Sequence, residues 1–279
     1  MTAGVWPAGL RLRRRAEPGG LAPVSVLLLH GMGGGVGNWD ALTVLLTPHI
    51  EVWDVRLPWA IGADQAWARS AAVTHWVADP VNRIRVLTGR GPDVIIAHSF
   101  AANLVLEMLA GLGGLELCNS IPVVLISPFC RGTRADLGWP SIIPSMKSCF
   151  SRFEEEIRLR RGSRVSDDIR KKMVQRAFEL MGAYPPLRFY QTYLRTAELG
   201  LEELTAPMLI VGGGGDIDAA VQSVSVLGRR IPHARTHIID GCGHFPMTER
   251  PAGLACLIED FIDGIGPQPR SARHREMLT

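Results

Sequence analysis

Residues 94–102 read Val-Ile-Ile-Ala-His-Ser-Phe-Ala-Ala, and they place Ser99 between two different patterns. The residues before it form a short apolar run rich in β-branched side chains, which predicts a buried strand. The residues after it favour a helix. A serine on such a tight turn is exposed at the carboxyl edge of a sheet, and the turn needs small residues two positions before and after it. Ala97 and Ala101 are small enough for this turn, although glycine is more usual there.

Similar short apolar runs recur along the chain, each closed by glycine or a polar turn. Most are continuously apolar, as expected for parallel strands that are buried on both faces. Helix-like segments lie between them, and this alternation predicts a mostly parallel, doubly wound α/β sheet flanked by helices. The predicted strands cover residues 24–29, 50–55, 94–97, 121–126, 208–211 and 236–239, and the predicted helices cover 38–46, 101–112, 219–230 and 251–263.

The alternation stops between residues 131 and 199, where no strand-like run occurs. Amphipathic stretches at 152–161 and 167–181 predict helices there, so we expect a helical segment inserted between two strands. We assign residues 1–130 and 200–265 to an α/β core and 131–199 to the insertion. The polar, basic residues 266–279 are expected to be a disordered tail.

Composition indicates an ordinary globular chain. Its 279 residues, 47% hydrophobic, can bury one large core with or without a small accessory domain. A net charge of +3 is too small to indicate a nucleic-acid partner. Five scattered cysteines favour neither a disulfide framework nor a zinc site, and they suggest a cytoplasmic location. The arginines at 11–15 and the apolar run at 24–29 do not make a signal peptide, and no stretch is long enough to span a membrane.

A glycine loop follows the first predicted strand, where residues 28–35 read Leu-Leu-His-Gly-Met-Gly-Gly-Gly. Backbone N–H groups in such a loop can be directed at a developing oxyanion. The alternative is a nucleotide-binding loop, which Asp54 at the end of the next predicted strand would support. No register of the glycines fits either G-x-G-x-x-G or the P-loop pattern, and this excludes nucleotide binding by a known motif.

Two further loops supply a carboxylate and an imidazole. Residues 207–218 read Pro-Met-Leu-Ile-Val-Gly-Gly-Gly-Gly-Asp-Ile-Asp, so that Asp216 closes a glycine turn directly after a strand. It is the preferred partner for a histidine, whereas Asp218 is better placed to cap the next helix. Residues 241–251 read Gly-Cys-Gly-His-Phe-Pro-Met-Thr-Glu-Arg-Pro, and His244 there is free to point into a cleft. The four glycines leave the exact placement of the acid open.

Taken together, these motifs resemble those of the α/β-hydrolase family over nearly all of residues 24–264. In that family a nucleophile, an acid and a base follow one another along the chain, which implies Ser99, Asp216 and His244 in these roles. The resemblance also implies an oxyanion hole formed by the backbone N–H groups of Met32 and Phe100, and it calls for no metal or organic cofactor. The insertion resembles the family's cap, which shapes the acyl pocket. Candidates to line that pocket are Trp139, Phe150, Phe189, Tyr190 and Tyr193. For each of them singly, packing within the cap is the favoured role.

The leading functional prediction is hydrolysis of a carboxylic ester or thioester through an acyl-Ser99 intermediate. The substrate would be a small acyl compound, free or carrier-bound. Basic residues outnumber acidic ones between residues 152 and 176. We interpret this stretch as a solvated helix face in preference to a docking site for an acidic carrier. The same triad can also serve carbon–carbon hydrolysis, a lyase reaction or cyclisation. Carbon–carbon hydrolases of the family commonly place tryptophan after the histidine, where this chain has Phe245. A third possibility is a small-molecule receptor without catalysis.

Overall fold

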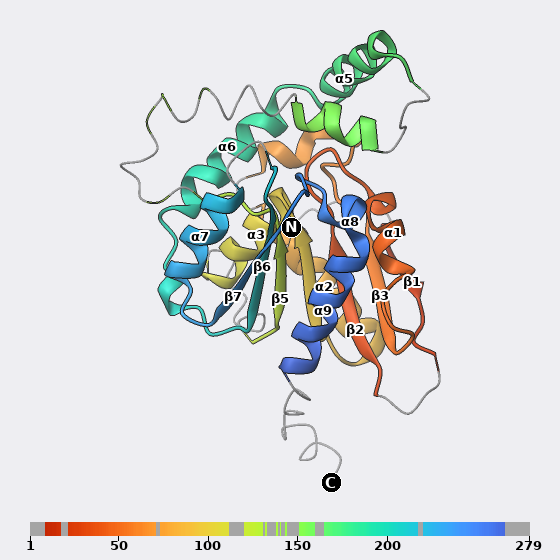
Figure 1. Ribbon diagram of the computed structural model, residues 1–279, viewed down its shortest axis with the longest axis vertical. Helices are drawn as coiled ribbons and strands as arrows, with labels where there is room; N and C mark the ends of the chain where they lie inside the picture. Colours follow the sequence, from red (N-terminus) through yellow and green to blue (C-terminus); the bar gives the residue numbers. More distant parts are fainter. Residues whose placement is uncertain are drawn as a thin grey trace.

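The computed structural model describes residues 9–17, 22–70, 73–111, 120–130, 132, 138, 140, 143, 151–159, 165–216 and 220–265. These residues form a seven-stranded sheet in the order β1-β3-β2-β4-β5-β6-β7 (Figure 1). Every neighbouring pair is parallel except β1 and β3, which are antiparallel. The strands are β1 (Leu10–Arg14), β2 (Val24–Leu29), β3 (Ile50–Val55), β4 (Val94–His98), β5 (Val123–Ile126), β6 (Met208–Gly213) and β7 (Ala234–Ile239).

The six predicted strands are all present, with small shifts at their ends. Strands β2 and β3 have the predicted bounds, and β6 continues two residues further, through Gly213. β5 begins at Val123, directly after Pro122, which has no N–H to donate to a neighbouring strand. The prediction of a mostly parallel sheet flanked by helices is confirmed.

Several elements were missed by the sequence analysis, among them the edge strand β1 and a long helix between β3 and β4. β1 reads Leu-Arg-Leu-Arg-Arg and contains no apolar run, because it is an edge strand. Its Arg11 and Arg13 side chains both pair with the buried carboxylate of Asp54 in β3. The helix α2 (His75–Thr88) carries Pro80 in its interior, a residue that normally argues against a helix.

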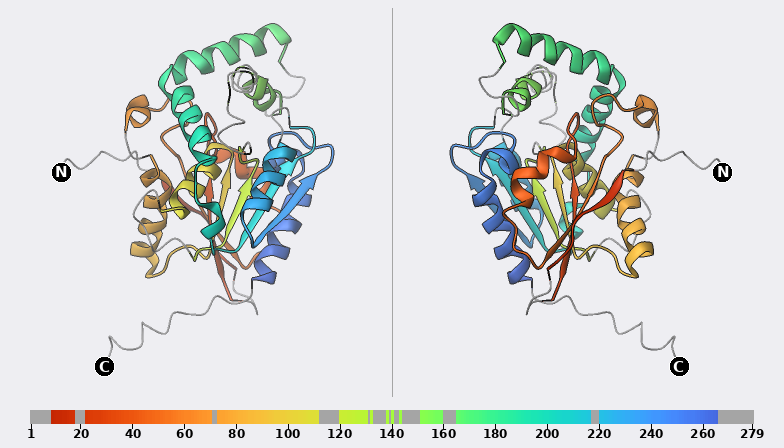
Figure 2. Two further views of the ribbon diagram at one scale, coloured as in Figure 1. Left: turned by 90° about the vertical axis from the view of Figure 1, so that its left-hand side faces the viewer. Right: turned by 90° about the vertical axis from the view of Figure 1, so that its right-hand side faces the viewer.

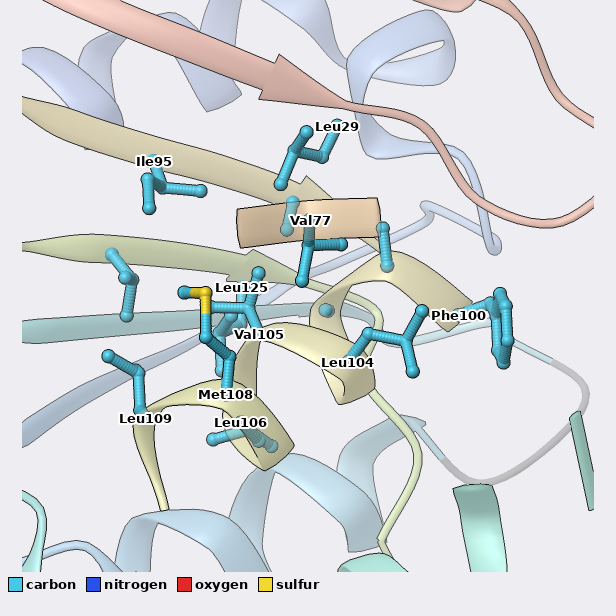
Figure 3. Packing of buried hydrophobic residues seen from close by; sticks show 14 of the residues in the cluster. Leu29, Val77, Ile95, Phe100, Leu104, Val105, Leu106, Met108, Leu109 and Leu125 are labelled. Atoms are coloured by element: carbon cyan, nitrogen blue, oxygen red, sulfur yellow. The ribbon is translucent and has the colours of Figure 1, made fainter. Parts of the chain in front are cut away.

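The helices cover the sheet in two layers, because successive side chains of a strand point to opposite faces. In β2, Leu27 and Leu29 belong to one core cluster, while Val26 and Leu28 belong to the other. The first cluster includes residues of α2, α3 (Phe100–Leu109), α6 (Tyr184–Thr196) and α7 (Ala220–Arg230), and Figure 3 shows α3 side chains packed against the strands. The second includes residues of α1 (Asp40–Thr43), α8 (Pro246–Glu249) and α9 (Pro251–Gly264).

The predicted helical insertion lies between β5 and β6. Its described residues contain no strand and form a helix at 151–159, then α5 (Asp167–Met181), then α6. Figure 2 shows α5 and the helix 151–159 beyond one end of the sheet, with α6 leading back toward the sheet. Trp139, Phe150 and the tail 266–279 lie outside the described residues. Within the described ranges, no helix has the length and apolarity needed to cross a membrane.

Candidate active site

Ser99 lies on a sharp turn between β4 and α3. Its φ of 56° and ψ of −121° are unusual for a residue with a side chain, and such backbone strain costs about 1–3 kcal/mol. The backbone N–H of Ser99 donates to the carbonyl oxygen of Ile126 in the neighbouring β5 at 2.8 Å, which fixes the turn. Ala97 and Ala101 are both fully buried, so alanine fits at the two positions where the turn needs small residues.

Ser127 has the second positive φ of a non-glycine residue in the described part of the chain, at 48°. It follows β5 as Ser99 follows β4, and it is also buried, but its backbone N–H donates to the carbonyl oxygen of Val211. Strain after a strand is therefore not enough to distinguish the two serines. The contacts of their hydroxyl groups distinguish them.

His244 contacts Ser99 on one side of its ring and Asp216 on the other. The Ser99 hydroxyl lies 3.1 Å from Nε2 of His244, and Nδ1 lies 2.7 Å from Oδ2 of Asp216. With the proton on Nδ1, the ring donates to the carboxylate and accepts from the serine hydroxyl. The structure thus brings together the three side chains that the sequence analysis selected from three separate loops.

Asp216 is held in place by the glycine turn that precedes it. The N–H of Gly214 donates to the carbonyl oxygen of Ile239 at 2.9 Å, and the N–H of Gly215 donates to that of Cys242 at 2.8 Å. Both acceptors lie shortly before His244 in the chain. At Gly213 a Cβ would collide with the carbonyl oxygen of Gly243, so only glycine lets β6 approach that loop so closely. The run of glycines therefore places the acid against its histidine. Asp218 lies outside the described residues.

The charge state of Asp216 follows from its surroundings. Its side chain is 3% exposed, and burial alone would raise the pKa of the carboxyl group. His244, through its charge and its hydrogen bond, and Arg152, through its charge, outweigh burial and lower the pKa of Asp216. Asp216 is therefore an anion at neutral pH, which is the charge state in which a carboxylate can orient an imidazole.

The glycine loop predicted to form the oxyanion hole lies directly beside Ser99. A Cβ at Gly31 would come within 2.9 Å of both the Cβ of Ser99 and Nδ1 of His98. Met32 lines the same small pocket as Ser99 and His244. Phe100 is the first residue of α3, where a backbone N–H has no acceptor within its own helix. Both predicted donors are thus next to the serine.

Two residues that the sequence analysis did not select hold the His244 loop. The carboxylate of Glu249 accepts hydrogen bonds from the N–H groups of Gly243 at 2.8 Å and Phe245 at 3.0 Å, the residues on either side of His244. His98 donates from Nε2 to the carbonyl oxygen of His244 at 2.9 Å. Burial and the neighbouring His244 lower the pKa of His98 well below its usual value, so it is neutral. In the sequence, the only indication that either residue belongs to the site is that both lie within the motifs quoted above.

A pocket of about 40 Å³ adjoins Ser99 and His244, and residues of the helical insertion form part of its wall. Phe189 lines it, whereas Tyr190 and Tyr193 are buried in the core cluster around α3, in the packing role that was favoured for each of these residues. Arg152, expected on a solvated face, is instead buried beside this pocket, with its guanidinium 4.7 Å from the ring centroid of Phe129. Exposed members of the same basic stretch are Arg158, Lys171, Lys172 and Arg176.

Comparisons with known proteins agree with this fold. A family model described as the alpha/beta hydrolase family matches residues 26–255. A pimeloyl-[acyl-carrier protein] methyl ester esterase of Aromatoleum aromaticum is 28% identical over 270 residues, which cover 86% of this chain and 98% of that protein. A 2-hydroxymuconate semialdehyde hydrolase of a Pseudomonas species is 23% identical, with coverage of 85% and 86%.

Solved structures show the same architecture. The meta-cleavage product hydrolase of Pseudomonas fluorescens superposes with a TM-score of 0.66 at 17% identity, covering 92% of this chain and 94% of its own. MenH from Staphylococcus aureus superposes with a TM-score of 0.60 at 16% identity, covering 92% and 98%. At these identities the likeness concerns the fold.

Proposed function

Because the chain belongs to the alpha/beta hydrolase family and is a hydrolase, we propose that it cleaves a carboxylic ester or thioester through an acyl-Ser99 intermediate. The observation that carries the proposal is the continuous hydrogen-bonded series from Ser99 through His244 to Asp216. A hydroxyl group is a weak nucleophile, and an adjacent imidazole held by a carboxylate is an established way to activate it.

In the proposed reaction the oxygen of Ser99 attacks the carbonyl carbon of the substrate. Nε2 of His244 takes the hydroxyl proton during the attack and then gives it to the departing alcohol or thiol. Asp216 keeps the proton of the neutral ring on Nδ1 and stabilises the imidazolium that forms. Water, activated by the same imidazole, then attacks the acyl-enzyme and releases the acid.

The tetrahedral intermediate carries a negative oxygen, for which we propose the backbone N–H groups of Met32 and Phe100 as donors. The support is their position, since Met32 lines the Ser99 pocket and Phe100 begins the helix that follows the serine. Removing one such donor typically costs about 100- to 1,000-fold in rate. Because the donors are backbone groups, the adjoining backbone matters more than the Met32 or Phe100 side chain.

We further propose that residues 131–199 act as a cap over this site. Arg152, Phe153 and Phe189 of this segment already border the pocket at Ser99. The proposed substrate is a small-molecule acyl ester or thioester. The relative from Aromatoleum aromaticum, whose name specifies a carrier-bound methyl ester, extends the proposal to carrier-bound acyl groups.

The test is covalent labelling with a fluorophosphonate, followed by mass spectrometry of the labelled peptide. We expect one adduct, on Ser99, lost in Ser99→Ala and slowed in His244→Ala. Ser127→Ala is the matched control, since Ser127 is also buried with a positive φ, and it should be labelled like the parent protein. Absence of an adduct, or an adduct on another residue, would contradict the proposal and favour a receptor.

A second candidate, supported by the relative named 2-hydroxymuconate semialdehyde hydrolase, is hydrolysis of a carbon–carbon bond by the same residues. Product analysis separates the two reactions. An ester substrate yields an acid and an alcohol or thiol, whereas carbon–carbon hydrolysis yields an acid and a product with a new C–H bond. Turnover of simple acyl esters with Ser99-dependent burst kinetics would favour the first.

A further inference from the structure

A second cavity, with a volume of about 680 Å³, lies beside the small pocket at Ser99. Its described walls are the glycine loop, residues of the helix 151–159 and one side of α5. A cavity of this size can hold a small organic ligand, whereas the 40 Å³ pocket holds little more than one water molecule. The wall of the larger cavity includes the apolar side chains of Val36, Ile61, Ile157, Ile169, Met173 and Leu180, and its charged members are Arg56, Glu156, Lys172 and Arg176.

The two cavities share two wall residues, Phe153 and Glu156. The ring edge of Phe153 occupies the place where a Cβ at Gly33 would lie, so the ring rests directly on the glycine loop beside Ser99. Glu156 is tethered, because Nδ2 of Asn38 donates to its carboxylate at 3.1 Å. Phe153 is thus the apolar partition between the small pocket and the large cavity.

We infer that the larger cavity holds the long apolar arm of the acyl substrate, and that Phe153 determines whether this arm can extend from Ser99 into it. The inference rests on the proposed acyl-serine reaction. The ring packs against Gly33 and the ring of Phe178, but it also borders the empty volume of both cavities. A change of rotamer into that volume does not require the backbone to move. With the ring on Gly33, only a short acyl group fits at Ser99. With the ring turned away, the two volumes join.

Phe153 is therefore a specificity-determining residue for acyl length. In hydrophobic pockets a single additional methylene already changes kcat/KM by about tenfold or more. Removing the ring should therefore favour long acyl groups over short ones by at least about this factor. Filling the far end of the large cavity should have the opposite effect.

The experiment compares kcat/KM for nitrophenyl esters from acetate to dodecanoate. We expect Phe153→Ala to raise the ratio of dodecanoate to acetate by about tenfold or more. Phe261→Ala is the matched control: its ring is also buried, but in the core cluster that does not contain Phe153, and it borders neither cavity among the described residues. It should leave the ratio as in the parent. Ile169→Trp, at a half-exposed position in the cavity wall, should lower the ratio.

An unchanged ratio in Phe153→Ala, or the same change in Phe261→Ala, would overturn the inference. Binding of dodecanoate to Ser99→Ala protein, measured by calorimetry, tests the cavity without turnover. Binding that Ile169→Trp weakens would support the cavity assignment even if no ester were hydrolysed and the proposed reaction failed. Absence of binding in a folded Ser99→Ala protein would overturn the assignment.

Discussion

Oδ2 of Asp216 lies 2.7 Å from Nδ1 of His244, and each side chain is only 3% exposed. A hydrogen bond between a buried carboxylate and an imidazole is charge-assisted once the ring is protonated, and it is then stronger than a neutral bond. The bond also selects the tautomer, because the carboxylate can only accept. The basic nitrogen of His244 is thereby directed at Ser99.

Asp216→Asn is expected to lower kcat by about 10,000-fold while the fold is retained. The amide can donate to Nδ1, which would favour the tautomer with its proton on Nε2, the wrong side for accepting the serine proton. Ester turnover and thermal unfolding would be measured on the same preparation. Asp218→Asn serves as the control and should turn over like the parent. A larger loss in Asp218→Asn than in Asp216→Asn would assign the acid to Asp218.

Gly31→Ala is expected to lower kcat by about 100- to 1,000-fold, the usual cost of one lost oxyanion donor. The new Cβ would press against Ser99 and His98 and displace the loop that carries the Met32 N–H. Gly35→Ala is the control in the same loop, since a Cβ there meets no atom within 4 Å. Steady-state kinetics with an acetate ester measures both variants. Equal activity would show that the loop does not bind the oxyanion.

Glu249→Ala is expected to lower kcat about tenfold or more with little change in KM, because the backbone on both sides of His244 loses its acceptor. Glu249→Gln, which keeps one acceptor oxygen, should fall between the alanine variant and the parent. Glu259→Ala is the control: Glu259 also accepts from a backbone N–H, that of Thr47, at 2.7 Å, but far from the serine. If both alanine variants lost stability equally and neither lost kcat, Glu249 would have only a structural role.

Glu107 gives the protein a pH-dependent stability. It is 1% exposed on α3, and burial raises the pKa of its carboxyl group from 4.5 to about 7, despite Arg195 at 3.2 Å and the nearby Arg188. Between these two values the folded state holds a proton that the unfolded state has released. The contribution of Glu107 to the free energy of unfolding therefore falls as pH rises through this window.

Glu107→Gln removes this titration. The free energy of unfolding of the variant minus that of the parent should rise by about 2 kcal/mol from about pH 5.5 to about pH 8. Urea unfolding at both pH values measures the difference. Glu179→Gln, at a partly exposed ion pair with Arg176, should show no such trend. A constant difference between Glu107→Gln and the parent would show that Glu107 ionises alike in the folded and unfolded states.

Local pattern alone predicted much of this molecule. Continuous apolar runs closed by glycine mark strands buried on both faces, and six of the seven strands were found in this way. Because parallel strands end at one edge of a sheet, polar residues that follow them meet there. That reasoning selected Ser99, Asp216 and His244, which the structure brings together. Their roles in catalysis stay predictions.

Other features depend on contacts between residues far apart in the sequence, and local pattern carries little signal for them. The strand β1 is held by Arg11 and Arg13 on Asp54, about forty positions away. The partition between the cavities exists only because Phe153 packs on Gly33. Hydrophobic periodicity records which face of a helix is buried, but not which side chain of another helix or loop will meet it. The sequence alone therefore determined the sheet and the residues at its edge, whereas the packing of the helical insertion decided the shape of the pocket.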